Sequence, residues 1–248
     1  ENELDNRTHS FEKFSYGVER FVIGLAKKVL IANQLGQLCK VFTETNEKTI
    51  LFYWIFAVGY MLQIYFDFSA YSDMAIGLGK MFGFDFLENF DYPYISKSIT
   101  EFWRRWHISL GTWFKDYIYY PISLSKPMKK MTNSLRKLLG NHYGPLLSGT
   151  FALFVVWFLN GLWHGAGWTY ILFGLYHFVM ISIGNITRTP FNKLYAKLNI
   201  QNSKILKGLQ IIKTVFLVIL GELIFRAETV NSAFIMIKKI FTSYKVSS

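Results

Sequence analysis

Two histidines stand in surroundings where an imidazole could act as a base. His164 lies inside an apolar run from Leu146 to Ile183, directly between Trp163 and Gly165. An ionisable side chain there must face a cavity or a partner, because an isolated charge in hydrocarbon is costly. A histidine held in this way could take a proton from a hydroxyl group, so that the oxygen attacks an activated acyl group. The alternative is an interfacial belt, in which tryptophan and histidine rings lie at the level of the lipid headgroups.

The second histidine, His107, follows a segment with a helix-start signal. Ser98 with Glu101 three residues later, just before an apolar run, is typical of a helix N-cap. We expect one continuous helix that places four side chains on one face, with Arg104 and Arg105 pointing elsewhere. The four are Trp103, Trp106, His107 and Leu110. This short, aromatic and basic helix is expected to lie along the membrane or to dip into it.

Two aspartates, Asp67 and Asp73, lie in apolar surroundings where neither can face lipid. They are open to two interpretations, a proton or ion site and a polar network that ties helices together. No basic residue occurs in the same segment, so we favour the network, with Ser69, Ser72 and nearby tyrosines as partners.

Other chemistries find little support in the sequence. We expect no metal site, because no HxxxH or HExxH motif is present. A G-x-S-x-G elbow of serine hydrolases is also missing, and the single cysteine, Cys39, excludes an internal disulfide. His9 and His142 are expected in polar segments, and His177 is expected to serve in packing.

The elements that must position these residues are membrane helices. The chain has 248 residues, of which 52% are hydrophobic, and its apolar runs are long enough to cross a bilayer. We expect a span over 50–68, two passes within 146–183 and a span over 209–225. Residues 1–14 are expected to be a loop, 16–38 an interfacial helix or a span, 43–48 a turn and 231–241 a further helix. The fold class predicted is all-α, a polytopic transmembrane bundle with short interfacial or re-entrant helices, forming a single membrane domain over 1–248.

Charge predicts how these helices are oriented. The net charge is +11, and the basic residues concentrate in 126–137 and 187–207, between apolar runs. This distribution is typical of cytoplasmic loops facing anionic lipid, not of a nucleic-acid-binding protein. From the first of these loops, His164 is reached after roughly 18 residues, about 27 Å of helix and at or beyond the middle of the bilayer. Because the chain opens at Glu1 in a charged stretch, we expect it to be an internal piece of a longer protein.

Three motifs, in this order, resemble those of the membrane-bound O-acyltransferase family. They are YFDFSAYSDMA at 65–75, FWRRWHISL at 102–110 and GLWHG at 161–165. The branch that they resemble is the bacterial one with alginate O-acetyltransferases and teichoic-acid D-alanyltransferases, and the likeness extends from about Tyr16 to Arg226. The resemblance implies a helical membrane fold with a tunnel joining the two faces. It also implies that His164 is the catalytic histidine and His107 the second motif histidine, although His107 could serve only to order the helix of Arg104 and Arg105.

The resemblance further implies a reaction and its participants. An acyl thioester, acetyl-CoA or an acyl-carrier protein, would donate from the cytoplasmic side, with no bound cofactor. The acceptor would be a hydroxyl of an extracytoplasmic envelope polysaccharide, and an extracytoplasmic partner protein would complete the transfer, at the bacterial plasma membrane. Asn160, Trp163, Trp106, Arg104, Arg105, Asp67 and Asp73 are the residues expected to line or support the tunnel.

The chain departs from the family pattern in two places. Family members have further spans before the position of Glu1, and the alginate-type pattern has a glycine-rich turn where this chain has residues 122–126. The motif at 102–110 favours acetyl transfer, and D-alanyl transfer to teichoic acid is the alternative. Two rival functions remain: a transporter that uses Asp67, Asp73 and His164 as a proton relay, and a non-catalytic scaffold whose basic loop at 126–137 binds an acidic carrier or anionic lipid.

Overall fold

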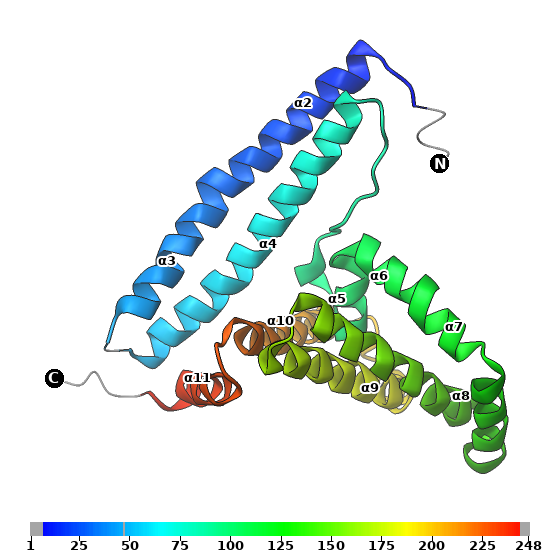
Figure 1. Cartoon of the computed structure of the whole chain (residues 1–248). Helices are drawn as coiled ribbons and strands as arrows, with labels where there is room; N and C mark the ends of the chain where they lie inside the picture. The colour runs from blue at the N-terminus through cyan, green and yellow to red at the C-terminus, as the bar shows by residue number, and fades with distance from the viewer. Residues whose placement is uncertain (1–6, 47, 244–248) are drawn as a thin grey trace. The chain divides into compact units, whose positions relative to one another are not determined.

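The computed structural model describes residues 7–46 and 48–243, and these residues form helices and no β-strand (Figure 1). Four helices are long and apolar enough to cross a membrane. They are α4 (Ile50–Met81), α8 (Lys126–His164), α9 (Trp168–Lys197) and α10 (Lys204–Arg226). The predicted all-α membrane fold is confirmed. The chain divides into two compact units, residues 1–91 with 235–248 and residues 92–234.

In the first unit, a long helical segment runs alongside α4 (Figure 1). It consists of α2 (Phe11–Ala26), the π-helical stretch η1 (Lys27–Ala32) and α3 (Asn33–Glu44). The helix therefore begins at Phe11, within the stretch predicted as a loop, because the hydroxyl of Ser10 caps it by accepting a bond from the Lys13 amide. Residues 1–6 of that predicted loop lie outside the described residues.

Glycines allow α2 and α4 to approach closely. A Cβ atom at Gly77 would lie 2.6 Å from the carbonyl oxygen of Gly17, and one at Gly24 would lie 2.8 Å from that of Ala70. Farther along, the phenyl ring of Phe42 in α3 stacks on Phe56 of α4 with 4.0 Å between ring centroids. Small residues are typical of tightly packed membrane helices.

Ion pairs join the same two segments. Arg20 and Lys27 both contact the carboxylate of Asp73, at 2.6 and 2.5 Å, and Lys28 pairs with Asp67. The network interpretation of the two aspartates agrees with these contacts, but the expected partners were wrong. The bases come from a helix about 40 to 50 residues away in sequence, so inspecting the aspartates' own segment could not reveal them.

The end of α4 is also tied to the start of α2. Lys13 and Lys80 both bond to the carboxylate of Asp85, and these bonds hold its pKa below the usual range. At the other end of the unit, α11 (Val230–Thr242) reaches the start of α4, where Phe241 packs edge-on against Trp54 at 6.0 Å between ring centroids.

The second unit is built on the antiparallel pair α8 and α9, with α10 packed against α9 (Figure 1). Several short elements precede this pair: η2 (Pro93–Ile95), α5 (Ile99–Arg105), α6 (Ile108–Phe114), η3 (Lys115–Tyr119) and α7 (Tyr120–Ser123). Both η2 and α5 pack against α10, and α5 also packs against α9. The two passes predicted within 146–183 are confirmed as α8 and α9.

The basic segment at 126–137 is helical, not a loop, and it folds back on the span that follows. Gly140 has a φ of 79°, which breaks α8 near its start. Beyond this break the chain reverses, so that the hydroxyl of Thr132 donates to that of Ser148 at 2.8 Å. A glycine at 144 is needed for this contact, because a Cβ there would lie 2.6 Å from the Arg136 amide nitrogen.

Candidate active site

His164 is the last residue of α8, where the chain turns into α9. The next residue, Gly165, has a φ of 151°, which side-chain-bearing residues rarely adopt. A Cβ atom there would also lie 2.8 Å from the ring of Tyr170. The two properties of Gly165 end the helix at His164 and let Tyr170 close over the turn.

Aromatic rings from three helices surround the imidazole of His164. Centroid distances from it are 4.8 Å to Trp163, 5.0 Å to Phe225, 5.9 Å to Phe173 and 6.4 Å to Tyr170. Three of these rings meet it edge-on or tilted at a steep angle. Such edge-to-face packing fixes the plane of a ring, so the imidazole is held in one orientation.

His107 lies beside the same tryptophan. Its ring centroid is 6.0 Å from that of Trp163, which itself contacts His164. The structure thus brings together the two histidines and Trp163, three of the residues predicted for the site. Trp163 is 55% exposed and accessible from outside the bundle.

The continuous helix predicted across His107 is wrong. α5 ends at Arg105, Trp106 is extended, and His107 adopts a left-handed conformation with a φ of 47° before α6 begins. Both helix ends keep their backbone bonds, since the Trp106 amide donates to Phe102 and the Gly111 amide to His107. The extended Trp106 stacks its buried ring on Phe102 at 5.6 Å, and burial of both rings stabilises the break.

Burial lowers the pKa of His107 below its ordinary value of 6.5, because removal from water disfavours the imidazolium. At pH 7 the ring is therefore neutral. Acidification acts against the folded state, since the unfolded chain takes up the proton first. The contribution to stability is lost as the pH falls from 6.5 through the lowered pKa.

The helix before His107 is capped as predicted. The hydroxyl of Ser98 accepts a bond from the Glu101 amide, and the Glu101 carboxylate accepts one from the Lys97 amide. This is close to the reciprocal arrangement of a capping box. Arg105 pairs with Glu101 at 3.3 Å and Arg104 is exposed, so neither arginine lies on the face that carries Trp103.

Trp103 connects α5 to a third histidine. Its indole nitrogen donates to Nδ1 of His177 at 3.2 Å, and His177 is only 1% exposed, with Trp157 and Phe173 against its ring. Because Nδ1 accepts, a neutral His177 carries its proton on Nε2. The expectation of a packing role for His177 agrees with this burial.

The remaining residues predicted for the site are Asn160, Asp67 and Asp73. Asn160 is buried in α8 one turn before His164, and its Oδ1 has no hydrogen-bond partner among the described residues. Asp67 and Asp73 belong to the first unit. Glu222, a buried carboxyl group in the apolar span α10, was not among the residues predicted for the site; the signal for it was its charge within that run.

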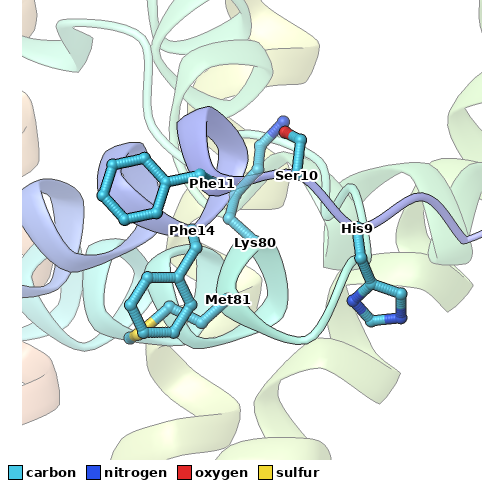
Figure 2. Close-up of a pocket in the computed structure, with 6 residues that line it drawn as sticks. All are labelled: His9, Ser10, Phe11, Phe14, Lys80 and Met81. Carbon is cyan, nitrogen blue, oxygen red and sulfur yellow. The ribbon is translucent and has the colours of Figure 1, made fainter.

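A hollow in the first unit offers a poor alternative site. It is open and is lined by His9, Ser10, Phe11, Phe14, Lys80 and Met81 (Figure 2). Ser10 already caps α2 and Lys80 already pairs with Asp85, and Phe11 is 87% exposed. Over the described residues, no three His, Cys, Asp or Glu side chains come together as metal ligands.

Comparison with known proteins gives these residues a context. The chain is 40% identical over 244 residues to a protein of Pseudomonas aeruginosa named probable alginate O-acetylase AlgI, a match that covers 97% of this chain and 41% of that protein. It is 32% identical to the peptidoglycan O-acetyltransferase of Helicobacter pylori, covering 94% of this chain and 40% of the relative. It is 34% identical to the teichoic acid D-alanyltransferase of Bacillus subtilis, covering 72% and 43%.

The chain thus spans about two fifths of the length of these relatives. The family model for membrane-bound O-acyltransferases matches residues 1–135, more than half of the chain, and includes His107. Together with the four apolar helices, these similarities mark a multi-pass bacterial membrane protein, and the chain belongs to the membrane-bound O-acyltransferase family.

Proposed function

We propose that this protein is an O-acyltransferase that moves an acyl group, with acetyl favoured, from a cytoplasmic thioester toward a hydroxyl of an extracytoplasmic envelope polysaccharide. The observation that carries the proposal is that His164 and His107 both lie beside the ring of Trp163. The relatives' names support the reaction class, since they include O-acetylases acting on alginate and peptidoglycan.

In the proposed step, His164 is the general base. Its ring takes the proton of the acceptor hydroxyl as the oxygen attacks the thioester carbonyl, and the C–S bond then breaks. The thiolate that leaves recovers the proton from the imidazolium, so the histidine returns to its neutral form. The aromatic rings cover part of the half-buried imidazole and so limit the access of water that could hydrolyse the thioester.

His107 has a supporting part in this proposal. Its lowered pKa leaves it neutral at pH 7, so its ring can donate a hydrogen bond without adding a charge beside His164. Acetyl-CoA and an acyl-carrier protein are both candidate donors, and an extracytoplasmic protein would complete transfer to the polymer. The ion pairs of Asp67 and Asp73 weigh against a transporter, because a proton relay needs carboxylates that can exchange their protons.

The test is mild-base release of ester-linked groups from the envelopes of cells that carry the full-length protein or its His164→Ala form. We expect ester content to fall at least a hundredfold, since removing a general base typically costs about 10²–10⁴ in rate. His142→Ala is the matched control, because His142 lies in the same helix and contacts Thr189 instead of the site. Release of acetate identifies acetyl transfer, and release of D-alanine identifies the alternative.

An unchanged ester content in His164→Ala cells, with the protein present in the membrane, would contradict the proposal. The scaffold alternative makes the opposite prediction: charge reversal within 126–137 would remove activity while His164→Ala kept it.

A further inference from the structure

Glu222 is an acidic residue buried in the apolar helix α10. Its side chain is 7% exposed, and α10 is among the helices apolar enough to cross a membrane. Carboxyl groups at such positions are costly and usually serve a function. One oxygen accepts a hydrogen bond from the hydroxyl of Tyr94, whereas Oε2 has no hydrogen-bond partner among the described residues. The Tyr94 bond is therefore the interaction through which Glu222 can act.

Tyr94 links Glu222 to the backbone that carries His107. The Tyr94 ring lies 5.9 Å from Phe102 and 6.4 Å from Trp106, and those two rings stack on each other. Trp106 is the extended residue directly before His107. Loss of the Tyr94 hydrogen bond would loosen this aromatic stack, and the left-handed backbone at His107 depends on the stack for its stability.

Glu222 is also one helical turn from a residue that contacts His164. Phe225 packs edge-on against the imidazole at 5.0 Å and contacts Phe173 at 5.1 Å. The residue directly before Glu222, Gly221, lies against the ring of His177. A Cβ atom added at Gly221 would be 2.6 Å from Nε2 of His177. The section of α10 around Glu222 thus contacts the supports of both motif histidines.

We propose that Glu222 is a positioning residue that fixes His107 and His164 relative to each other by anchoring Tyr94 to α10. The inference rests on the proposed acyltransferase function. Glu222 touches no reacting atom; it acts through the Tyr94 hydroxyl on one side and through the placement of Phe225 on the other.

Four variants of the full-length protein test the proposal, with base-released ester per amount of protein in the membrane as the measurement. Glu222→Leu and Tyr94→Phe each remove the hydrogen bond, and we expect each to lower ester formation about tenfold, the scale of one lost bond to a buried polar group. Glu222→Gln keeps an acceptor oxygen for Tyr94 and should retain most of the activity. The double variant Tyr94→Phe with Glu222→Leu should be no worse than either single variant, because both changes break one interaction.

Three results would overturn the inference: full activity in Tyr94→Phe, multiplied losses in the double variant, or a loss in Glu222→Gln as large as in Glu222→Leu. The last would indicate that the carboxyl group itself is needed. If Glu222→Leu does not reach the membrane, Tyr94→Phe decides alone, since it removes a single hydroxyl. Active His164→Ala would instead refute the proposed function, so the two failures are distinguishable.

Discussion

Trp163 is the side chain that both motif histidines contact, but the two histidines are held by different means. His164 is fixed by rings from α8, α9 and α10, so packing between helices decides where it points. His107 is fixed by its own left-handed backbone and by the buried Trp106 before it. Errors in helix packing should therefore affect His164 first, whereas changes in the aromatic stack should affect His107.

At the scale of single residues, the ion pairs of α4 give a matched pair of predictions. Asp73 is buried, with 7% of its side chain exposed, and Asp67 is 44% exposed. Asp73→Asn leaves Arg20 and Lys27 without their shared carboxylate, and we expect a loss toward the lower end of the about 3–5 kcal/mol typical of broken buried pairs. Asp67→Asn should cost about 0–1 kcal/mol, as exposed pairs do.

Thermal unfolding in detergent would measure both variants. If Asp73→Asn and Asp67→Asn lower the unfolding temperature equally, the burial of Asp73 does not make its ion pairs stronger than the exposed pair of Asp67, and the prediction is wrong.

Sequence alone predicted some of these residues and missed others for a definite reason. The apolar run around His164 and the capping signal at Ser98 are local patterns, and both predictions are confirmed. The break at Trp106 was missed because apolar spacing of three and four residues continues across it. The bond between Tyr94 and Glu222 joins residues far apart in the chain, so no local pattern could predict it.

At the scale of helices, the close crossing of α8 and α9 sets the position of His164. A Cβ at Gly161 would lie 2.7 Å from the carbonyl oxygen of Tyr170, and one at Gly174 would overlap the carbonyl oxygen of Trp157. The backbones touch at this crossing, one turn before His164. Glycines are visible in the sequence, but which of them face a neighbouring backbone depends on the rotation of each helix.

Gly174→Ala and Gly184→Ala should have opposite effects, although both lie in α9. At Gly174 the added methyl group forces the helices apart, and we expect a loss of about 1–3 kcal/mol with a parallel fall in ester formation. At Gly184 no atom lies within 4 Å of the added Cβ, so alanine should be neutral or stabilise the helix by up to about 1 kcal/mol.

Unfolding temperature and ester content, measured on the same membranes, check this prediction. A Gly174→Ala protein as stable and active as the Gly184→Ala protein would contradict the close crossing.

At the scale of the whole molecule, the second unit predicts a membrane topology. The basic segment at 126–137 and the turn after α9 lie at the same end of the hairpin, and α10 then returns to the other side. By the bias of Lys and Arg toward the cytoplasm, Ser134 should face the cytoplasm and Glu228 the exterior. Both residues are exposed, so they can report their side of the membrane.

Single cysteines at these positions, in a Cys39→Ser background, test the topology with a maleimide that cannot cross membranes. Ser134→Cys should react in inside-out vesicles and Glu228→Cys in intact cells. Labelling of both from one side would rule out an odd number of crossings between them and would require a new arrangement of α8 to α10.

The π-helical stretch η1 has a consequence for how this chain tolerates insertions and deletions. A π-helix corresponds to an α-helix with one residue inserted, and each residue of an α-helix turns it by about 100°. Deleting one residue within Lys27–Ala32 would therefore let this stretch close into ordinary α-helix while Gly17 and Phe42 still face α4. A deletion in α2 between Gly17 and Lys27 has no wide turn to absorb it and would rotate Gly17 away from α4 by about 100° relative to Phe42. Outside η1, a change in length that looks minor in an alignment would exchange the packed face of half the segment for its outer face.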